Sequence, residues 1–168
     1  MSVETELDVL EILIIGSPET GKSRFVETIC ERATRDGKGW HFGHLNVDGD
    51  LHIQFIEPPS SAYFDFMWMR ELIDRSDVPG FIVVCDSTQP ERFGEAVGLL
   101  QTVQACHPYS QCVLVANKQD LPQAWNAEDI RIGLNIPENI LVVPCVAHDV
   151  EAVKEAVLQL LYQIFAVT

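Results

Sequence analysis

A glycine-rich stretch near the N-terminus has the residue types and spacing that bind phosphate. "GSPETGKS" (residues 16–23) follows the apolar run "LEILII" and precedes "RFVETICERA", which is typical of a helix. The stretch matches G-x-x-x-x-G-K-[ST] in full, between an expected strand and an expected helix, as this motif requires. Backbone N–H groups of such a loop surround an oligophosphate, while Lys22 would reach its terminal groups and the Ser23 hydroxyl would ligate Mg²⁺. We therefore predict a phosphate-binding loop; the alternative is an ordinary turn before a helix.

A second polar cluster follows a later apolar run. "ANKQD" (116–120) stands at the end of "CVLVAN". A carboxylate can accept hydrogen bonds from both the ring N–H and the amino group of guanine, a bidentate contact that adenine cannot make. Asp120 is therefore a candidate for reading guanine. Asn and Asp are also common in helix-capping turns, which is the alternative for these residues.

These motifs resemble those of the Ras superfamily of small GTPases. N-K-x-D behind an apolar strand is similar to the guanine-reading motif of that superfamily, and "NKQDLP" is particularly similar to its Arf-like branch and the bacterial Ras-like (gliding-motility GTPase-like) relatives. The resemblance implies that Asn117 ties its loop to the phosphate loop and that the stem of Lys118 lies over the base. "PCVAHD" places Ala147 thirty residues beyond Asn117 (147 − 117), the interval that the family shows before its last guanine-contacting loop.

The ligands that the resemblance implies are GDP or GTP with Mg²⁺. The residues expected to bind the nucleotide are Gly16, Ser17, Pro18, Glu19, Thr20, Gly21, Lys22, Ser23, Arg24, Asn117, Lys118, Asp120, Val146 and Ala147. The expected metal ligands are Ser23 and Glu57, and Lys22 is the expected catalytic residue, because its charge would stabilise the transition state.

The region after the third expected strand departs from the family pattern. Where the family has D-x-x-G, this chain has Glu57-Pro58-Pro59-Ser60, and Ser61 stands where the family has a glutamine that orients water. Glu57 keeps a carboxylate but adds a methylene, and the two prolines stiffen the segment and remove N–H donors. Thr34, the threonine available to cap Mg²⁺, is expected to end the first helix instead.

Two functions are compatible with these motifs. One is a guanine nucleotide-binding small GTPase that hydrolyses GTP slowly or with the help of a partner. The alternative is a pseudo-GTPase, an interaction module that binds nucleotide without switching, which the altered residues 57–61 favour. An ATP-using kinase is a weaker third reading, because it leaves Asp120 unexplained.

The expected elements alternate along the chain. Six strands are expected at 10–15, 44–47, 51–56, 81–86, 112–117 and 140–145, and helices at 22–35, 61–76, 90–106, 127–134 and 149–165. The Asp48-Gly49 pair predicts a hairpin between the second and third strands, and the near-continuous apolar strands predict burial on both faces. We therefore predict one domain over residues 1–168, of α/β class: a three-layer α/β/α sandwich with a six-stranded, mostly parallel sheet, one antiparallel hairpin strand and the P-loop GTPase fold.

Composition limits the other functions. The formal net charge of −14 disfavours binding to nucleic acid or to anionic lipid. Because no apolar run approaches about 20 residues and the signals for secretion and lipidation are missing, we expect a cytoplasmic protein without a direct membrane anchor. Five cysteines without a C-x-x-C pair are expected to be reduced and buried. His41 and His44 are three apart, so on one strand they point to opposite faces and cannot share a metal.

The segment "SAYFDFMWMRELIDR" carries more apolar surface than one helix face needs. Aromatic and methionine side chains around 60–70 would cover more than the single stripe that packs on a sheet. We therefore expect a protein partner to dock there, as it does in the corresponding switch of the family. The alternative is that an irregular loop turns all of these side chains into the core.

Overall fold

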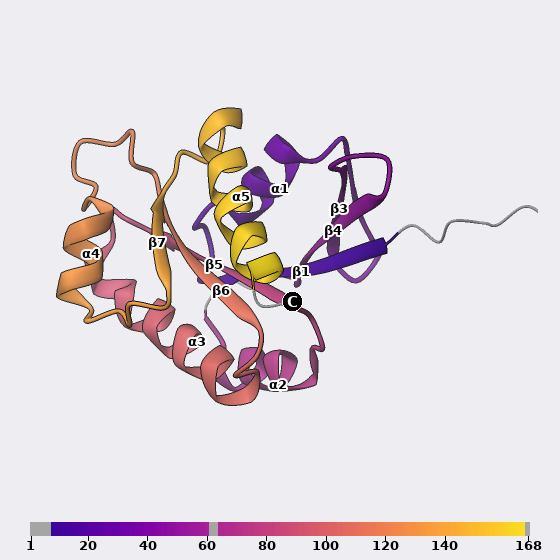
Figure 1. The fold of residues 1–168 in the computed structure, drawn as a ribbon. Helices are drawn as coiled ribbons and strands as arrows, with labels where there is room; N and C mark the ends of the chain where they lie inside the picture. Colours follow the sequence, from indigo (N-terminus) through magenta and orange to yellow (C-terminus); the bar gives the residue numbers. More distant parts are fainter. Residues whose placement is uncertain (1–7, 61–63, 167–168) are drawn as a thin grey trace, which may run out of the picture.

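A seven-stranded sheet runs through the computed structural model, which describes residues 8–60 and 64–166 (Figure 1). Its strand order is β2-β3-β4-β1-β5-β6-β7. The strands β4, β1, β5, β6 and β7 are parallel, and β3 pairs antiparallel with both β2 and β4. The strand bounds are β1 Asp8–Gly16, β2 Arg32–Arg35, β3 His41–Asn46, β4 Leu51–Glu57, β5 Gly80–Asp86, β6 Gln111–Asn117 and β7 Leu141–Pro144.

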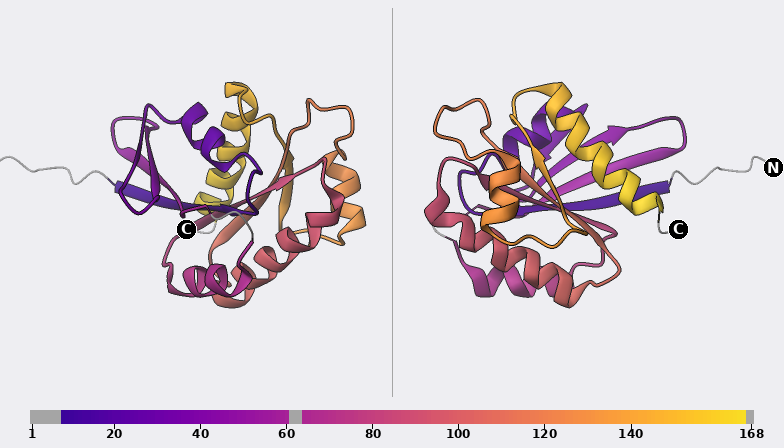
Figure 2. Two further views of the ribbon diagram at one scale, coloured as in Figure 1. Left: turned by 180° about the vertical axis from the view of Figure 1, so that it is seen from behind. Right: turned by 60° about the vertical axis from the view of Figure 1, so that its left-hand side comes forward.

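Helices cover both faces of the sheet, as the two views in Figure 2 show. Their bounds are α1 Lys22–Ile29, α2 Phe66–Arg75, α3 Phe93–Cys106, α4 Ala127–Gly133 and α5 Val150–Ala166, with a short 3₁₀ helix at Pro90–Arg92. Successive side chains of a strand point to opposite faces, so β1 supplies both cores. Ile12 and Ile14 pack with α1 and α5, whereas Leu13 and Ile15 pack with α2, α3 and α4. The predicted three-layer α/β/α class is confirmed.

The prediction of six strands is wrong, because a seventh strand, β2, lies where the first helix was expected to continue. That helix was expected over 22–35, but α1 ends at Ile29, where Cys30 turns to an extended conformation. The Glu31 N–H then donates to the His44 carbonyl at 3.0 Å, and residues 32–35 pair with β3. Thr34 therefore lies in a strand and does not end a helix. A stretch of four mostly exposed residues is too short and too polar for its pattern to indicate a strand.

The other elements differ from expectation mainly at their ends. The Asp48-Gly49 hairpin is confirmed, with β3 paired antiparallel to β4. The second predicted helix begins only at Phe66, because the Asp65 side chain accepts a hydrogen bond from the Trp68 N–H and caps it. The predicted helix from residue 90 begins with a 3₁₀ turn before α3. Among the described residues, no helix combines the length and the apolar character needed to cross a membrane.

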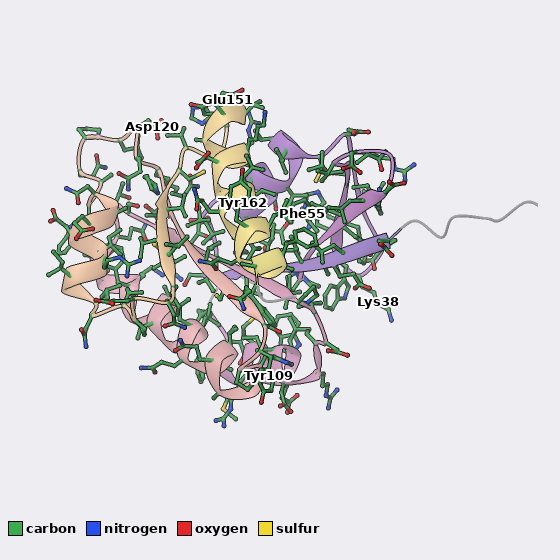
Figure 3. All side chains as sticks on the ribbon, in the orientation of Figure 1. Lys38, Phe55, Tyr109, Asp120, Glu151 and Tyr162 are labelled. Atoms are coloured by element: carbon green, nitrogen blue, oxygen red, sulfur yellow. The ribbon has the colours of Figure 1, made fainter. Side chains whose placement is uncertain are left out.

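The carboxyl ends of the parallel strands bring the sequence motifs to one edge of the sheet. The loop after β1, the end of β4, and the loops after β6 and β7 all reach this edge. Figure 3 shows Asp120 near the end at which α5 begins, marked by Glu151, and Tyr109 toward the opposite end of the molecule. Ligands of open parallel sheets bind outside the carboxyl ends of the strands, so the fold positions these loops for that role.

Candidate functional site

The loop between β1 and α1 is wrapped tightly, and two glycines permit it. A Cβ on Gly16 would lie 2.4 Å from the Val84 carbonyl oxygen of β5, so this position accepts no side chain. Gly21 has a φ of +102°, and a Cβ there would lie 2.3 Å from Nδ2 of Asn117. The Thr20 hydroxyl closes the turn by donating to the Ser17 carbonyl at 3.1 Å. Glycine is therefore required at both ends of the loop for steric reasons.

The N-terminus of α1 is open toward the loop. Gly21 is its N-cap and offers no side-chain acceptor, and the first turn holds no acidic residue. The first N–H groups of a helix lack partners within the helix and carry a partial positive charge. This end of α1 can therefore bind an anion. An open groove of about 510 Å³ lies here, lined by Pro18, Glu19, Gly21, Lys22, Ser23, Arg24, Glu57 and Ser60.

Lys22 is buried within the loop that it would serve. Its Nζ donates to the carbonyl oxygens of Gly16 at 3.1 Å and Ser17 at 2.7 Å. Burial lowers the pKa of Lys22 to about 8; the nearby Arg92 also lowers it, and Glu57 acts in the opposite direction. Within the described part of the chain no carboxylate forms an ion pair with Lys22, so its buried ammonium group gains charge compensation when an anion binds beside it.

Asn117 connects the phosphate loop to the two later loops. It is 2% exposed. Its Nδ2 donates to the Thr20 carbonyl at 2.8 Å, and its Oδ1 accepts from the Ala147 N–H at 2.9 Å. The predicted tie from Asn117 to the phosphate loop is present, and Ala147 is held by the same side chain.

Lys118 and Glu19 are joined across the site, and both have an unusual backbone conformation. Their φ angles are +67° and +64°, in the left-handed region that L residues rarely adopt. The Lys118 ammonium donates to the Glu19 carbonyl at 3.0 Å and pairs with Asp86 at 2.7 Å. Burial acts to raise the pKa of Asp86, but hydrogen bonds from Lys118 and Thr88 lower it overall. Such conformations persist where the surrounding contacts fix them, often at functional sites.

The remaining predicted nucleotide ligands lie around the rim. Asp120 follows β6, with its side chain 44% exposed and one carboxylate oxygen 3.9 Å from Nε2 of His148. Val146 is half-buried, and Arg24 is exposed on α1. Pro18 is half-buried and faces α2. The structure therefore brings Asn117, Lys118 and Ala147 into contact with the phosphate loop or with each other, and leaves the Asp120 carboxylate partly exposed at the rim beside His148.

Glu57 ends β4 in a polar cluster with Ser23. The Ser23 hydroxyl donates to both Glu57 oxygens, at 2.8 and 2.9 Å. Glu57 is 1% exposed, and its Oε1 also contacts Nδ1 of His41 at 2.8 Å. The Arg35 guanidinium lies 3.2 Å from the Ser23 hydroxyl oxygen and 3.9 Å from Glu57. The two predicted metal ligands are therefore adjacent.

The sequence interpretation missed His41 and Arg35 in this cluster. Arg35 pairs with His41 across β2 and β3, and His41 pairs with Glu57 across β3 and β4. Cross-strand partners share one face of a sheet, so this register places Arg35, His41 and Glu57 in one row. The sequence could have indicated this row only if residues 32–35 had been assigned to a strand.

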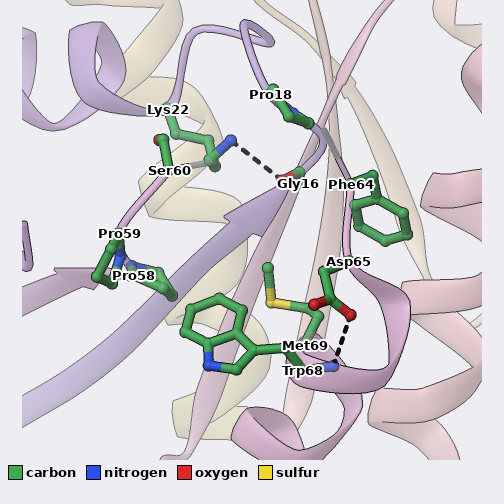
Figure 4. A pocket seen from close by; sticks show the side chains of 10 residues that line it. All are labelled: Gly16, Pro18, Lys22, Pro58, Pro59, Ser60, Phe64, Asp65, Trp68 and Met69. Carbon is green, nitrogen blue, oxygen red and sulfur yellow. Dashed lines mark hydrogen bonds between the residues drawn. The ribbon is translucent and has the colours of Figure 1, made fainter. Parts of the chain in front are cut away.

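Pro58 and Pro59 separate Glu57 from α2. With the phosphate loop and the start of α2 they line a small pocket of about 30 Å³ (Figure 4). Trp68 and Met69 stand on its α2 side and Lys22 on its loop side. Ser61, expected where the family has a glutamine, and Tyr63 of the predicted partner segment lie outside the described residues.

Comparisons with known proteins agree on one family. Residues 70–164 match the sequence model of the ADP-ribosylation factor family. The chain is 30% identical over 134 residues to ADP-ribosylation factor-like protein 10 of Mus musculus, an alignment covering 78% of this chain and 54% of that protein. It is 29% identical over 132 residues to ADP-ribosylation factor-like protein 9 of Homo sapiens, covering 76% of this chain and 68% of that protein. The alignment thus spans about half the length of the mouse relative.

A solved structure has the same fold. The Arl6 (BBS3) small GTPase from Trypanosoma brucei, with the bound nucleotide analogue GppNp, superimposes with a TM-score of 0.74. The match covers 95% of this chain and 99% of that one, at 14% sequence identity. At this identity the likeness establishes the fold alone.

Proposed function

Because this chain belongs to the ADP-ribosylation factor family, within the Ras superfamily of small GTPases, we propose that it binds GDP and GTP beside the phosphate loop. The observation that carries the proposal is the pair of hydrogen bonds through which Asn117 holds Thr20 and Ala147. They fix the loop that would hold phosphate against the two loops that would hold the base. The diphosphate would lie against the N–H groups at the start of α1, and Lys22 would contact its terminal oxygens.

Guanine recognition is assigned to Asp120. Its carboxylate is half in solvent at the rim, and Lys118, two residues before it, is anchored to the phosphate loop. Asp120 would accept from the ring N–H and the amino group of guanine. The Ala147 N–H already donates to Asn117, so Ala147 would border the base with its methyl group and Val146 with its side chain.

We propose Mg²⁺ as the metal, with Ser23 as its direct protein ligand. Hydroxyl and carboxylate oxygens are the donors that Mg²⁺ prefers, and Ser23 and Glu57 supply both kinds. The Ser23 hydrogen is donated to Glu57, and the hydroxyl oxygen, which accepts from Arg35, has lone pairs that a metal can use. Glu57 would orient that hydroxyl or a water of the metal. The metal, when bound, would neutralise phosphate charge.

We propose that GTP hydrolysis is slow or partner-dependent. Lys22 and the backbone donors of the loop would stabilise charge developing on the phosphate. The alternative is a nucleotide-binding pseudo-GTPase, and the specific feature that favours it is the segment after β4. Glu57 and Pro58 are buried and two successive prolines restrict the backbone, which opposes the movement that a switch requires.

A competition experiment tests nucleotide binding and its specificity. A fluorescent GDP analogue bound to the protein should be displaced by GDP and GTP but not by ADP. Asp120→Asn should weaken GDP and improve XDP, because the asparagine amide donates to the carbonyl that xanthine carries in place of the amino group. Unchanged preference in Asp120→Asn would remove this residue from the proposal, and displacement by none of the purine nucleotides would reject the function.

Single-turnover hydrolysis separates the two forms of the function. Protein loaded with GTP should yield GDP over minutes to hours if it is a slow enzyme. Recovery of unchanged GTP, with turnover gained in Glu57→Asp, would identify the pseudo-GTPase. The Glu57→Gln protein is the matched control, because it keeps the side-chain length and removes the charge.

We also propose that a protein partner docks on the outer face of α2. Met67 is 67% exposed and Trp68 is 40% exposed, beside the pocket that reaches Lys22. Large apolar side chains are favoured at such interfaces. The free cysteines of the chain suit a reducing compartment, and we propose that it acts in the cytoplasm.

A further inference from the structure

Three charged or polar side chains form a row that leads from the sheet edge to the phosphate loop. Arg35, His41 and Glu57 are cross-strand partners in β2, β3 and β4. The row ends on the Ser23 hydroxyl, which contacts both Glu57 and Arg35. It therefore sets a cation from β2 beside the residue proposed to ligate the metal.

The Ser23 hydroxyl already has two kinds of partner in this row. It donates its single hydrogen to Glu57, and its oxygen accepts from the Arg35 guanidinium at 3.2 Å. A Mg²⁺ ligand must offer a lone pair of the same oxygen at about 2.1 Å. A guanidinium and a divalent cation on one hydroxyl oxygen repel each other strongly. Arg35 and a metal at Ser23 are therefore mutually unfavourable.

The second terminal nitrogen of the Arg35 guanidinium is held as well. This nitrogen, Nη1, donates to the Gly39 carbonyl at 3.0 Å, within the turn that joins β2 and β3. The side chain is 44% exposed, so guanidinium N–H groups that are not used in these contacts can meet solvent beside Ser23, which lines the groove. A guanidinium has five donors in a fixed plane and binds phosphate oxygens bidentately.

We propose that Arg35 competes with Mg²⁺ for the Ser23 hydroxyl and compensates the charge of bound GDP when no metal is present. The inference rests on the proposed function, because it concerns the same nucleotide site. Its consequence is a GDP complex that depends little on Mg²⁺. Arg35, Lys22 and the start of α1 then supply the positive charge around the diphosphate.

The experiment compares GDP affinity with and without metal. The dissociation constant of a fluorescent GDP analogue is measured in excess Mg²⁺ and in EDTA, for the wild type, Arg35→Gln and Arg35→Lys. We expect the wild-type value to change by less than about threefold, and the Arg35→Gln value to rise by about tenfold or more in EDTA, the loss typical of a charge-assisted contact. Mg²⁺ should restore Arg35→Gln, and Arg35→Lys should fall between the two.

A metal titration gives a second readout. When GDP-loaded protein is titrated with Mg²⁺, Arg35→Gln should reach its midpoint at a lower Mg²⁺ concentration than the wild type, because the competing cation is gone. Arg32→Gln is the matched control: it removes an exposed arginine from the same strand, three residues away, and should behave as the wild type.

The outcomes distinguish this inference from the proposed function. If the wild type binds GDP in Mg²⁺ but releases it in EDTA, or if Arg35→Gln and the wild type respond equally to the metal, Arg35 has no such role and nucleotide binding stands. If neither protein binds GDP or GTP under any condition, the proposed function fails and the inference fails with it.

Discussion

The side-chain amide of Asn117 donates a hydrogen bond to the carbonyl oxygen of Thr20 at 2.8 Å, across 97 positions of the chain. The carbonyl oxygen of the same amide, Oδ1, accepts from the Ala147 N–H at 2.9 Å. One buried side chain therefore connects the phosphate loop, its own loop after β6 and the loop after β7. Both partners are backbone groups of loops, and such groups need a bonding partner wherever they are buried. The mutual position of the phosphate loop and the base-side loops therefore depends on one amide.

Replacing Asn117 by alanine should destabilise the protein and loosen the site together. The Ala147 N–H loses its acceptor and the Thr20 carbonyl its donor, and an unsatisfied buried group costs about 1–3 kcal/mol. We expect a loss of about 2–4 kcal/mol in the free energy of unfolding in urea. Asn139→Ala, at an exposed position, is the control and should stay within about 0.5 kcal/mol. Equal stability of the two variants would contradict the bridging role.

A methyl group at Gly21 should push the phosphate loop away from the loop that carries Asn117. The φ of +102° strains any L residue, and a Cβ would meet Asn117 Nδ2 at 2.3 Å. We expect Gly21→Ala to lower stability by at least about 1–2 kcal/mol and to weaken GDP binding, measured by unfolding and by fluorescence titration. Gly94→Ala, on the exposed side of α3 with open space around it, should instead stabilise by about 0.5–1 kcal/mol.

The phosphate loop could be predicted because its signal is local, whereas the Arg35 row could not. Residues 16–23 carry a contiguous motif, and the following helix and the strand before it were both expected there. The tie between Asn117 and the phosphate loop was expected only from family resemblance, because no rule of local sequence links positions 97 residues apart. Arg35 depends on β2, a strand that exists through its pairing with β3. Such tertiary contacts override the helical pattern that the sequence suggests.

The free cysteines also differ in how well local sequence predicts their burial. Strand-like runs correctly predicted that Cys85 and Cys112 are buried, and Cys145 is buried directly after β7. Cys30 and Cys106 are only half-buried, because each lies at the end of a helix instead of inside a strand. An apolar run is enough to predict that a residue in a buried strand is inaccessible to solvent. The exposure of a residue at the end of a helix depends instead on which elements pack around that end.

The two faces of α2 should respond differently to truncation. Met69 is 7% exposed and packs in the core with α3, whereas Met67 is 67% exposed. Met69→Ala should cost about 2–5 kcal/mol through lost burial and a cavity, and Met67→Ala about 0.5 kcal/mol or less. Thermal unfolding with circular dichroism measures both. A large loss in Met67→Ala would mean that this side chain serves the fold and not a partner.

GDP affinity should fall as the pH rises above about 8, because Lys22 then loses its proton in the free protein. Burial lowers its pKa to about 8, and a bound diphosphate favours the charged form, so the pKa is higher in the complex. Below pH 8 both states hold the proton and this contribution is flat. Above it, binding must take up a proton, and the affinity should fall by up to about tenfold per pH unit.

The Lys22→Met protein isolates this contribution. It should bind GDP more weakly and lack the decline that Lys22 causes, while the titrating groups of the nucleotide affect both proteins alike. The measurement is the difference between the two proteins in log Kd from pH 7 to 9, obtained by fluorescence titration. A difference that does not change across this range would show that Lys22 is protonated throughout or does not contact the phosphate. Loss of all binding in Lys22→Met leaves the wild-type decline as the test, with nucleotide titration corrected from the pH dependence of free GDP.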